Sequence, residues 1–192
     1  MSEKLIYMDN SATSPVDPEV LEEMLPYFNQ EFGNASTLYT LGVEAKKAVD
    51  KARKQVADLI NADPDEIYFT SGASESNNMA IKGICLKYQN RGKHIITTLL
   101  EHSSIIGPMN YLTNLGFEVD FVKITDEGLV DLEHLKSLMR NDTILVSISM
   151  VDSEVGLKQP IQEIAKIISE YPKCYFHVDC TQAYGKIPVD LT

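Results

Sequence analysis

Asp179 and Gln182 are the residues whose types and spacing best fit ligand chemistry. Asp179 follows a run of β-branched and aromatic residues that is typical of a buried parallel strand. A carboxylate and an amide at the carboxyl end of a strand could offer one planar ligand, such as a protonated pyridine ring, a charged acceptor and a neutral hydrogen-bonding group. Asp179 could equally cap the segment that follows it, because aspartate is a common cap.

A second candidate is the small-residue turn formed by Ser71, Gly72, Ala73 and Ser74. It lies between an expected strand and an expected helix. Free backbone N–H groups and the helix dipole at such a turn can hold a phosphate group, and Ser74 adds a hydroxyl donor. Serine and glycine also make ordinary helix starts, so the turn by itself leaves both interpretations open.

The third candidate is His102, which follows an expected strand at 94–98. An imidazole there could lie over an aromatic ligand or move protons near neutral pH. A single histidine is more often structural. The other three histidines are weaker candidates, because His94 starts a strand, His134 lies on a charged helix face and His177 lies inside a strand.

Strands and helices alternate along the chain, which predicts an α/β fold with a mostly parallel sheet flanked by helices. Helices are expected at about 17–25, 41–60, 129–139 and 160–168. Pro26 could bend or end the first of them. One further helix is expected to run from the small-residue turn through Leu86, and another to end near Gly116. Strands are expected at 66–70, 94–98, 117–122, 143–150 and 173–178.

Composition limits the classes of function. The 192 residues suffice for one domain with a sizeable core, and 44% are apolar. A formal charge of −11 argues against a nucleic-acid partner, and the apolar runs are too short and too interrupted for a membrane segment. Three cysteines without a C-x-x-C pair indicate neither a disulfide framework nor a zinc or other metal site, and favour reduced, cytoplasmic thiols.

Six motifs together are more specific than any one of them. They are YMDNSAT at 7–13, GNAS at 33–36, TSGASESNN at 70–78, EHSS at 101–104, VDSEVG at 151–156 and HVDCTQ at 177–182. In this order they closely resemble the cysteine desulfurases, pyridoxal-phosphate (PLP) enzymes of the class V aminotransferase group. The resemblance implies the large domain of fold-type I PLP-dependent transferases, incomplete at its C-terminus. Residues 1–192 would then hold an N-terminal segment and part of that domain, without the rest of it or the C-terminal small domain.

The resemblance assigns roles to individual residues. Ala73 and Ser74 match the positions that hold the cofactor phosphate, where the family usually has threonine in place of Ser74. His102 matches the histidine that stacks on the pyridine ring and is implicated in proton transfer. Asp179 matches the aspartate that keeps the ring nitrogen protonated. Gln182 matches the residue that hydrogen-bonds the phenolic oxygen of the ring.

Three further positions depart from the family pattern. Ser153 and Asp152 stand where the family usually carries two asparagines, so the contact near the phenolic oxygen is the least secure. Tyr39 stands where many relatives have histidine. The family's Schiff-base lysine, substrate-binding arginine and sulfur-accepting cysteine match nothing before Thr192. Lys186 comes too early to be that lysine.

No cysteine of this chain maps onto the catalytic cysteine. Cys180, beside Asp179, is interpreted as a small apolar-like residue at a strand end. The family's reaction converts L-cysteine to L-alanine and passes sulfur to an enzyme cysteine as a persulfide, for iron–sulfur cluster or other cofactor assembly. The implied partners are a sulfur-acceptor or scaffold protein and a second copy of the chain. A chain that lacks the lysine and the nucleophile is expected to be inactive alone.

Two alternatives remain open from the sequence. The chain could be a non-catalytic interaction fragment, because an unfinished sheet leaves a strand edge or an apolar face uncovered. It could also come from a related class V enzyme, a selenocysteine lyase or an aminotransferase, since the substrate-selecting residues match nothing in it.

Overall fold

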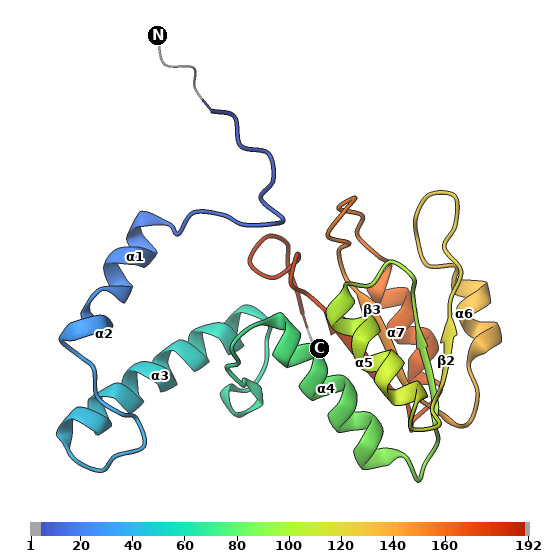
Figure 1. The fold of residues 1–192 in the computed structure, drawn as a ribbon, viewed down its shortest axis with the longest axis horizontal. Helices are drawn as coiled ribbons and strands as arrows, with labels where there is room; N and C mark the ends of the chain where they lie inside the picture. The colour runs from blue at the N-terminus through green and yellow to red at the C-terminus, as the bar shows by residue number, and fades with distance from the viewer. Residues whose placement is uncertain (1–4, 191–192) are drawn as a thin grey trace. The chain divides into compact units, whose positions relative to one another are not determined.

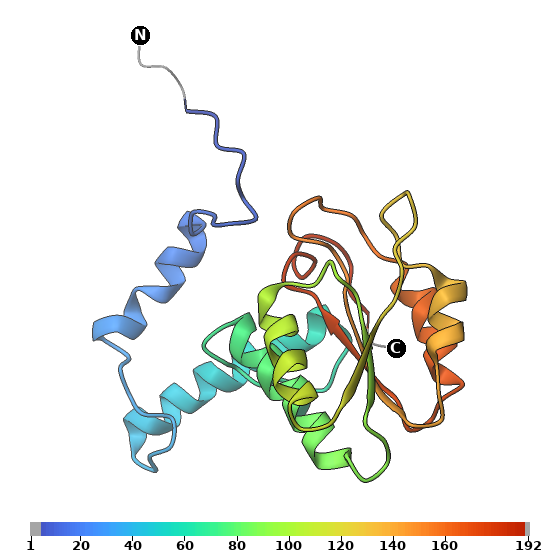
Figure 2. The same cartoon turned by 45° about the vertical axis from the view of Figure 1, so that its right-hand side comes forward.

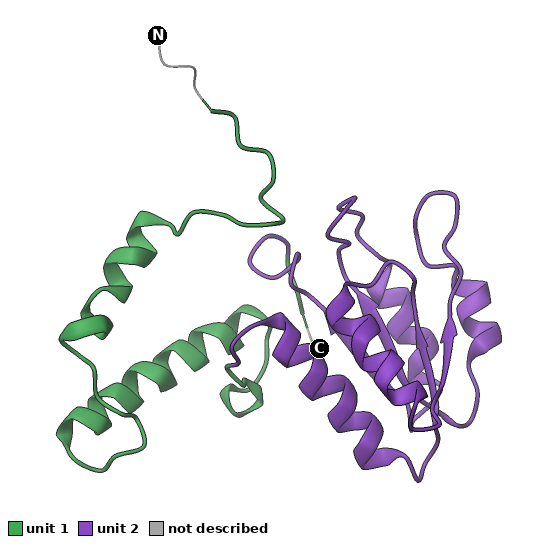
Figure 3. Ribbon diagram, viewed as in Figure 1, with its two compact units in different colours: residues 1–69, 188–192 green, residues 70–187 purple. Residues whose placement is uncertain are grey.

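The computed structural model describes residues 5–190. The chain divides into two compact units, residues 1–69 with 188–192 and residues 70–187 (Figure 3). The second unit contains the sheet and all six residues to which the resemblance assigns a cofactor role. Tyr39 lies in the first unit.

The second unit is built on a parallel sheet of four strands (Figure 1). These are β1 (His94–Thr97), β2 (Glu118–Phe121), β3 (Thr143–Ser149) and β4 (Tyr175–Asp179), in the order β2-β1-β3-β4. The chain moves from β1 to one side to form β2, and then crosses to the other side to form β3. The carboxyl ends of β1 and β3 therefore flank a topological switch point, where open α/β sheets bind ligands.

Helices cover both faces of this sheet (Figures 1 and 2). On one face, α4 (Ala73–Tyr88) and α5 (Ser103–Thr113) pack Ile81, Ile105 and Met109 against Ile95 and Leu145. Each fully buried isoleucine contributes roughly 1.5–3 kcal/mol relative to an exposed one. On the other face, α6 (Leu132–Leu138) and α7 (Ile161–Ser169) cover the sheet with a second apolar cluster, which includes Ile96, Val146, Ile148, Leu135, Ile164 and Ile168.

The α/β fold expected from the sequence is thus confirmed, and the strands expected in this unit form within two residues of their predicted bounds. The helix expected from 129 begins later, at Leu132. Asp131 explains the difference, because its side chain accepts a hydrogen bond from the His134 N–H and so caps the helix at that point.

The first unit is helical. It comprises α1 (Pro18–Met24), α2 (Pro26–Asn29), α3 (Thr40–Leu59) and the short 3-10 helix η1 (Pro64–Glu66). Asp17 caps α1 through the Glu19 N–H, and Pro26 ends α1 and starts α2, as its position in the apolar pattern predicted. Within α3, only Gly42 and Ala57 are buried.

The strand predicted at 66–70 is wrong. Residues 64–66 form η1, which Asp63 and Glu66 close with a capping box, and residues 67–70 follow without strand pairing. Ile67 is extended, and its carbonyl accepts a hydrogen bond from the Arg53 guanidinium instead of from a neighbouring strand. The apolar run has the right backbone conformation, but a strand also needs a partner, and none of the described residues supplies one.

Candidate functional site

The candidate residues gather at the carboxyl edge of the sheet. Asp179 ends β4, the turn containing Ser153 follows β3, and Glu101 and His102 follow β1. Because all four strands are parallel, these segments leave the sheet on the same side. The topology alone therefore brings segments from three parts of the chain to one edge.

Asp179 makes the capping contacts that the sequence allowed. Its Oδ1 accepts hydrogen bonds from the Thr181 N–H at 2.8 Å and the Thr181 hydroxyl at 2.5 Å, which closes the turn after β4. Its Oδ2 accepts from the Asn77 amide at 2.9 Å. Burial raises the pKa of Asp179, but the hydrogen bonds from Thr181 and Asn77 outweigh it and hold the pKa below its ordinary value. The carboxylate is therefore ionised at neutral pH.

Asn77 connects this carboxylate to the histidine. Its side chain is only 4% exposed, and its Nδ2 lies 2.9 Å from Asp179 Oδ2 and 3.0 Å from Ser104 Oγ. Ser104 Oγ in turn lies 2.9 Å from His102 Nδ1. Asp179 and His102 are thus joined by a continuous chain of hydrogen bonds through two residues to which the sequence assigned no role.

A sequence signal for Asn77 does exist. Asn77, Ile81 and Cys85 lie at four-residue spacing on α4 and are all buried. A polar residue in register with an apolar helix face needs a buried partner, and that requirement could have singled it out. The identity of its partners could not be read from the sequence, because Asp179 lies 102 residues away.

The small-residue turn forms the N-terminus of α4. The Gly72 carbonyl accepts the N–H groups of Glu75 and Ser76, at 3.1 Å each. Within residues 70–187, the N–H groups of Ala73 and Ser74 and the Ser74 hydroxyl donate to no other group. A Cβ at Gly72 would meet nothing within 4 Å, so the approach to these donors is open. The donors that remain suit a phosphate group.

Two acidic side chains near the candidate site accept hydrogen bonds from residues of the turns in which they lie. Glu75 accepts from the Ser71 N–H at 2.7 Å and the Ser71 hydroxyl at 2.6 Å, and these bonds lower its pKa. Asp152 is buried and accepts from the N–H groups of Glu154 and Val155, at 3.0 and 2.5 Å. The aspartate that replaces a family asparagine therefore builds the turn after β3.

Ser153 and Gln182 lie in the turns that follow β3 and β4. Ser153 lies in the turn built by Asp152 and takes no part in the hydrogen-bonded chain from Asp179 to His102. The Gln182 carbonyl oxygen accepts from the Lys186 ammonium at 3.0 Å. That contact engages Lys186 one helical turn beyond Gln182.

Glu101 is a further residue to which the sequence assigned no role. It is 8% exposed; one carboxylate oxygen accepts from the Thr98 hydroxyl at 2.9 Å and the Ser149 N–H at 3.1 Å, and the other accepts from the Ser149 hydroxyl at 2.6 Å. It therefore ties the end of β1 to the end of β3, immediately before His102. Burial raises the pKa of Glu101, and these hydrogen bonds offset the effect only in part.

Comparison with known proteins decides the family. The model of the aminotransferase class-V family matches residues 6–192. The chain belongs to the class-V aminotransferase family. This family is PLP-dependent, and the resemblance to cysteine desulfurases is confirmed by a mitochondrial cysteine desulfurase of Candida albicans, which is 50% identical over 187 residues, or 97% of this chain.

Two solved structures share the fold. A NifS-like protein superposes with a TM-score of 0.94 at 40% identity, covering 97% of this chain and 51% of that one. A structure described as SspA in complex with cysteine gives a TM-score of 0.92 at 36% identity, covering 96% of this chain and 53% of that one. This chain spans 38% of the Candida albicans relative and about half of the two structures. Among the described helices, none has the length and apolar character needed to cross a bilayer.

The thiols of this class-V chain are poor nucleophiles where they lie. Burial raises the pKa of Cys85 and of Cys174 to about 12. Burial, with a smaller contribution from the negative charge of Asp179, raises the pKa of Cys180 to about 11. Since the thiolate is the reactive form, this supports the interpretation of Cys180 as a packing residue.

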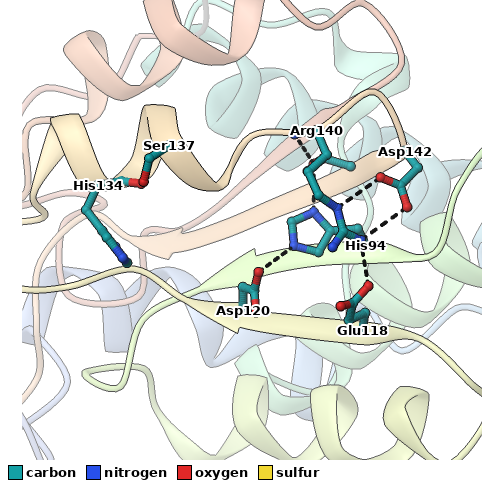
Figure 4. Close-up of polar contacts among 8 residues, drawn as sticks. His94, Glu118, Asp120, His134, Ser137, Arg140 and Asp142 are labelled. Carbon is teal, nitrogen blue, oxygen red and sulfur yellow. Dashed lines mark hydrogen bonds and ion pairs between the residues drawn. The ribbon is translucent and has the colours of Figure 1, made fainter.

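His94 lies away from the candidate site. His94 is fully buried where β1 begins, with Nδ1 2.7 Å from the Thr143 hydroxyl and Nε2 3.2 Å from Asp120 (Figure 4). Beside it, Arg140 pairs with Glu118 at 2.7 Å and Asp142 at 3.0 Å. These residues lie where β1, β2 and β3 start, at the edge opposite Asp179, so they stabilise the sheet.

The two remaining rings also have structural contacts. His134 accepts a hydrogen bond at Nδ1 from the Lys123 N–H, at 3.0 Å, and so holds the chain after β2 against α6. His177 lies inside β4, with Nδ1 2.9 Å from the Ser147 hydroxyl on β3, and burial lowers its pKa. His102 is thus the one histidine at the carboxyl edge with an exposed ring among the described residues.

Proposed function

We propose that this chain is the ring-binding part of a PLP-dependent cysteine desulfurase, which converts L-cysteine to L-alanine and passes sulfur to an enzyme cysteine as a persulfide. Residues 1–192 would supply the N-terminal segment and part of the large domain. The observation that carries the proposal is the hydrogen-bonded chain from Asp179 through Asn77 and Ser104 to His102, at the switch point of the sheet. It links the two residues expected to contact the pyridine ring.

The described side chains fit the cofactor. The free N–H groups of Ala73 and Ser74 and the Ser74 hydroxyl would hold its phosphate, and the ionised Asp179 would pair with its protonated ring nitrogen. Ser153 and Gln182 would lie near the phenolic oxygen. When bound, PLP supplies an electron sink for the carbanion of an amino-acid substrate.

Each residue has a defined task in this proposal. Asp179 keeps the proton on the ring nitrogen, because its own pKa is held low by Thr181 and Asn77. The N–H groups at the start of α4 fix the phosphate and so fix the position of the ring. His102 would contact the ring from the end of β1, where Glu101 anchors the backbone to β3.

The substrate and partners follow from the relatives. A structure that is 36% identical was solved with cysteine, which supports L-cysteine as the substrate. The persulfide would pass to a sulfur-acceptor or scaffold protein for iron–sulfur cluster or other cofactor assembly. We further propose a homo-oligomer with a cytoplasmic location. A selenocysteine lyase or an aminotransferase of the same family would use the same ring-binding residues.

Turnover requires groups that the described residues do not present. The three thiols have raised pKa values. Lys186 comes too early in the chain to match the family's Schiff-base lysine. We therefore expect PLP binding by this chain but little or no release of sulfide and alanine from L-cysteine. Sulfide formation at enzymatic rates by the chain alone would contradict this part of the proposal.

Equilibrium binding of PLP, followed by absorbance and by dialysis, tests the proposal directly. Asp179→Ala and Ser74→Ala should each weaken binding at least tenfold, because they remove the ring-nitrogen partner and a phosphate donor. The matched control is Asp142→Asn, which removes an acid at the opposite edge of the sheet and should leave affinity unchanged. Equal affinity of the wild type and Asp179→Ala would overturn the assignment of the ring site.

A second candidate function is that of a non-catalytic interaction fragment. Large apolar side chains of the first unit are exposed, with Leu38 at 96% and Phe28 at 72%. Exposed apolar side chains, where they form a contiguous patch, mark interaction surfaces. Size-exclusion chromatography with light scattering, combined with PLP binding, separates the two candidates: a homo-oligomer that binds PLP supports the first, and a stable assembly that does not bind PLP supports the second.

A further inference from the structure

The side-chain amide of Asn77 has a fixed orientation. Its Nδ2 contacts two acceptors, Asp179 Oδ2 at 2.9 Å and Ser104 Oγ at 3.0 Å. An ionised carboxylate can only accept hydrogen bonds, so the NH₂ group of Asn77, and not its carbonyl, must face Asp179. Both amide hydrogens are then used. Asp179 therefore determines which group Asn77 presents to Ser104.

The orientation of Asn77 decides what Ser104 presents to His102. Because Ser104 Oγ accepts from Asn77, its single hydrogen is available for His102 Nδ1, which lies 2.9 Å away. The Ser104 backbone N–H also points to Nδ1, at 3.2 Å, and a backbone N–H can only donate. Two donors thus converge on Nδ1, so this nitrogen must hold a lone pair.

We propose that Asn77 and Ser104 are positioning residues that hold neutral His102 in the tautomer with its proton on Nε2. The tautomer of a histidine is set by the hydrogen bond that its other ring nitrogen makes. The ring nitrogen that remains for a ligand is then a hydrogen-bond donor. Ser104 is 8% exposed and Asn77 4%, so water does not compete freely for these contacts.

The consequence for the reaction rests on the proposed function. Neutral His102 would donate a hydrogen bond from Nε2 to an oxygen of the cofactor or of an amino-acid substrate, and could not accept a proton at that atom without first changing its tautomer. Such a change would turn an N–H at Nδ1 toward the Ser104 N–H, which would cost the hydrogen bond from that backbone N–H and require the Ser104 hydroxyl hydrogen to turn away from Nδ1. The site would therefore favour ligands that place an acceptor atom next to Nε2, in the plane of the imidazole ring.

The tautomer itself can be measured without any cofactor. Long-range ¹H–¹⁵N spectra of the histidine-labelled chain, recorded at a pH above the titration of the imidazoles, distinguish a protonated from an unprotonated ring nitrogen. The His102 signals are assigned by their loss in His102→Gln. We expect Nδ1 far downfield of Nε2. The reverse order, or the averaged pattern of free histidine, would overturn the proposal whether or not the chain binds PLP.

Two substitutions test the role of the positioning residues. Ser104→Ala removes the hydroxyl donor, and Asn77→Asp offers the Ser104 hydroxyl a carboxylate in place of a donor, so each should narrow the gap between the two ¹⁵N shifts. The control is Asn78→Asp, which makes the same change at a neighbouring residue whose amide contacts the Ser74 carbonyl, and should leave the gap unchanged. An unchanged gap in both test variants would assign the tautomer to the backbone N–H alone and refute the role of both side chains.

Discussion

The amide of Asn77, near the start of α4, donates a hydrogen bond of 2.9 Å to the carboxylate of Asp179, 102 residues later at the end of β4. One turn before Asn77 lie the free N–H groups of Ala73 and Ser74. The contact therefore fixes the expected phosphate-binding turn relative to the expected ring-nitrogen partner. A cofactor bound by both would be held at its two ends by elements that already touch.

Replacing Asp179 tests the energetic weight of this contact. Asp179→Asn should lower the free energy of unfolding by about 1–3 kcal/mol, because Thr181 and Asn77 lose a charged acceptor. Urea denaturation at neutral pH measures the change. The control, Asp126→Asn in an exposed loop, should change stability by less than about 0.5 kcal/mol.

Asp179→Asn should also change how the free energy of unfolding depends on pH at acid pH. The pKa of Asp179 is lowered in the folded state from an ordinary value of 3.8, so its stabilising contribution is present above that pH and is lost as the pH falls through the folded value. Asp179→Asn should lack this loss. Parallel stability curves for wild type and variant on the acid side would contradict the assignment.

Glu101 should show the opposite dependence on pH. Its pKa is raised by burial from an ordinary value of 4.5, so its contribution is complete below that pH and is lost as the pH rises through the folded value. Glu101→Gln keeps the shape of the side chain and removes the charge. The variant should therefore gain stability relative to wild type as the pH rises from acid to neutral, measured as midpoints of urea unfolding. If the difference in urea midpoint between Glu101→Gln and wild type did not change with pH, Glu101 would not carry a buried charge.

His94 should make the fold sensitive to mild acid. Burial, and after it the charge of Arg140, lower its pKa from an ordinary value of 6.5. A lowered histidine pKa gives stability that is present above that value and is lost as the pH falls through the folded value. Thermal unfolding at a series of pH values should show a shallower fall for His94→Asn than for wild type. Identical pH dependence of the unfolding temperature in both proteins would show that the pKa of His94 is not lowered in the folded state.

The three cysteines should resist modification while the chain is folded. Because burial raises their pKa values to about 11 or 12, little thiolate is present near neutral pH. Ellman's reagent should react much more slowly with the native chain than with the chain in urea. A thiol that reacts in the native chain as fast as free cysteine would instead be a candidate sulfur carrier, and its replacement by serine would identify it.

Local patterns predicted most of the elements. The apolar spacing of α3 and the continuous apolar run of β3 carry their own signals, and Pro26 marks a helix end wherever it stands. The apolar run at 66–70 gave a wrong strand prediction, because its residues favour an extended backbone whether or not a second strand pairs with them. Local preference sets conformation, whereas pairing depends on the rest of the fold.

The sequence predicted the residues at the two ends of the hydrogen-bonded chain, but not the residues that join them. Asp179, His102 and the turn before α4 could be read from their positions after strands. Asn77 and Ser104 could not, because a hydrogen bond between them depends on how α4 and α5 lie against each other. Glu101 was passed over for a similar reason, since its partner Ser149 belongs to a different strand.

Helix α3 is mostly exposed, since only Gly42 and Ala57 are buried, and this exposure matters while the chain is being synthesised. Residues 5–69 leave the ribosome before the sheet of residues 70–187 exists, and they carry exposed phenylalanine and leucine side chains with no interior of their own. Unfolded apolar segments of this kind are what chaperones bind. Nascent chains of this protein should therefore depend on such assistance once residues 5–69 have been synthesised.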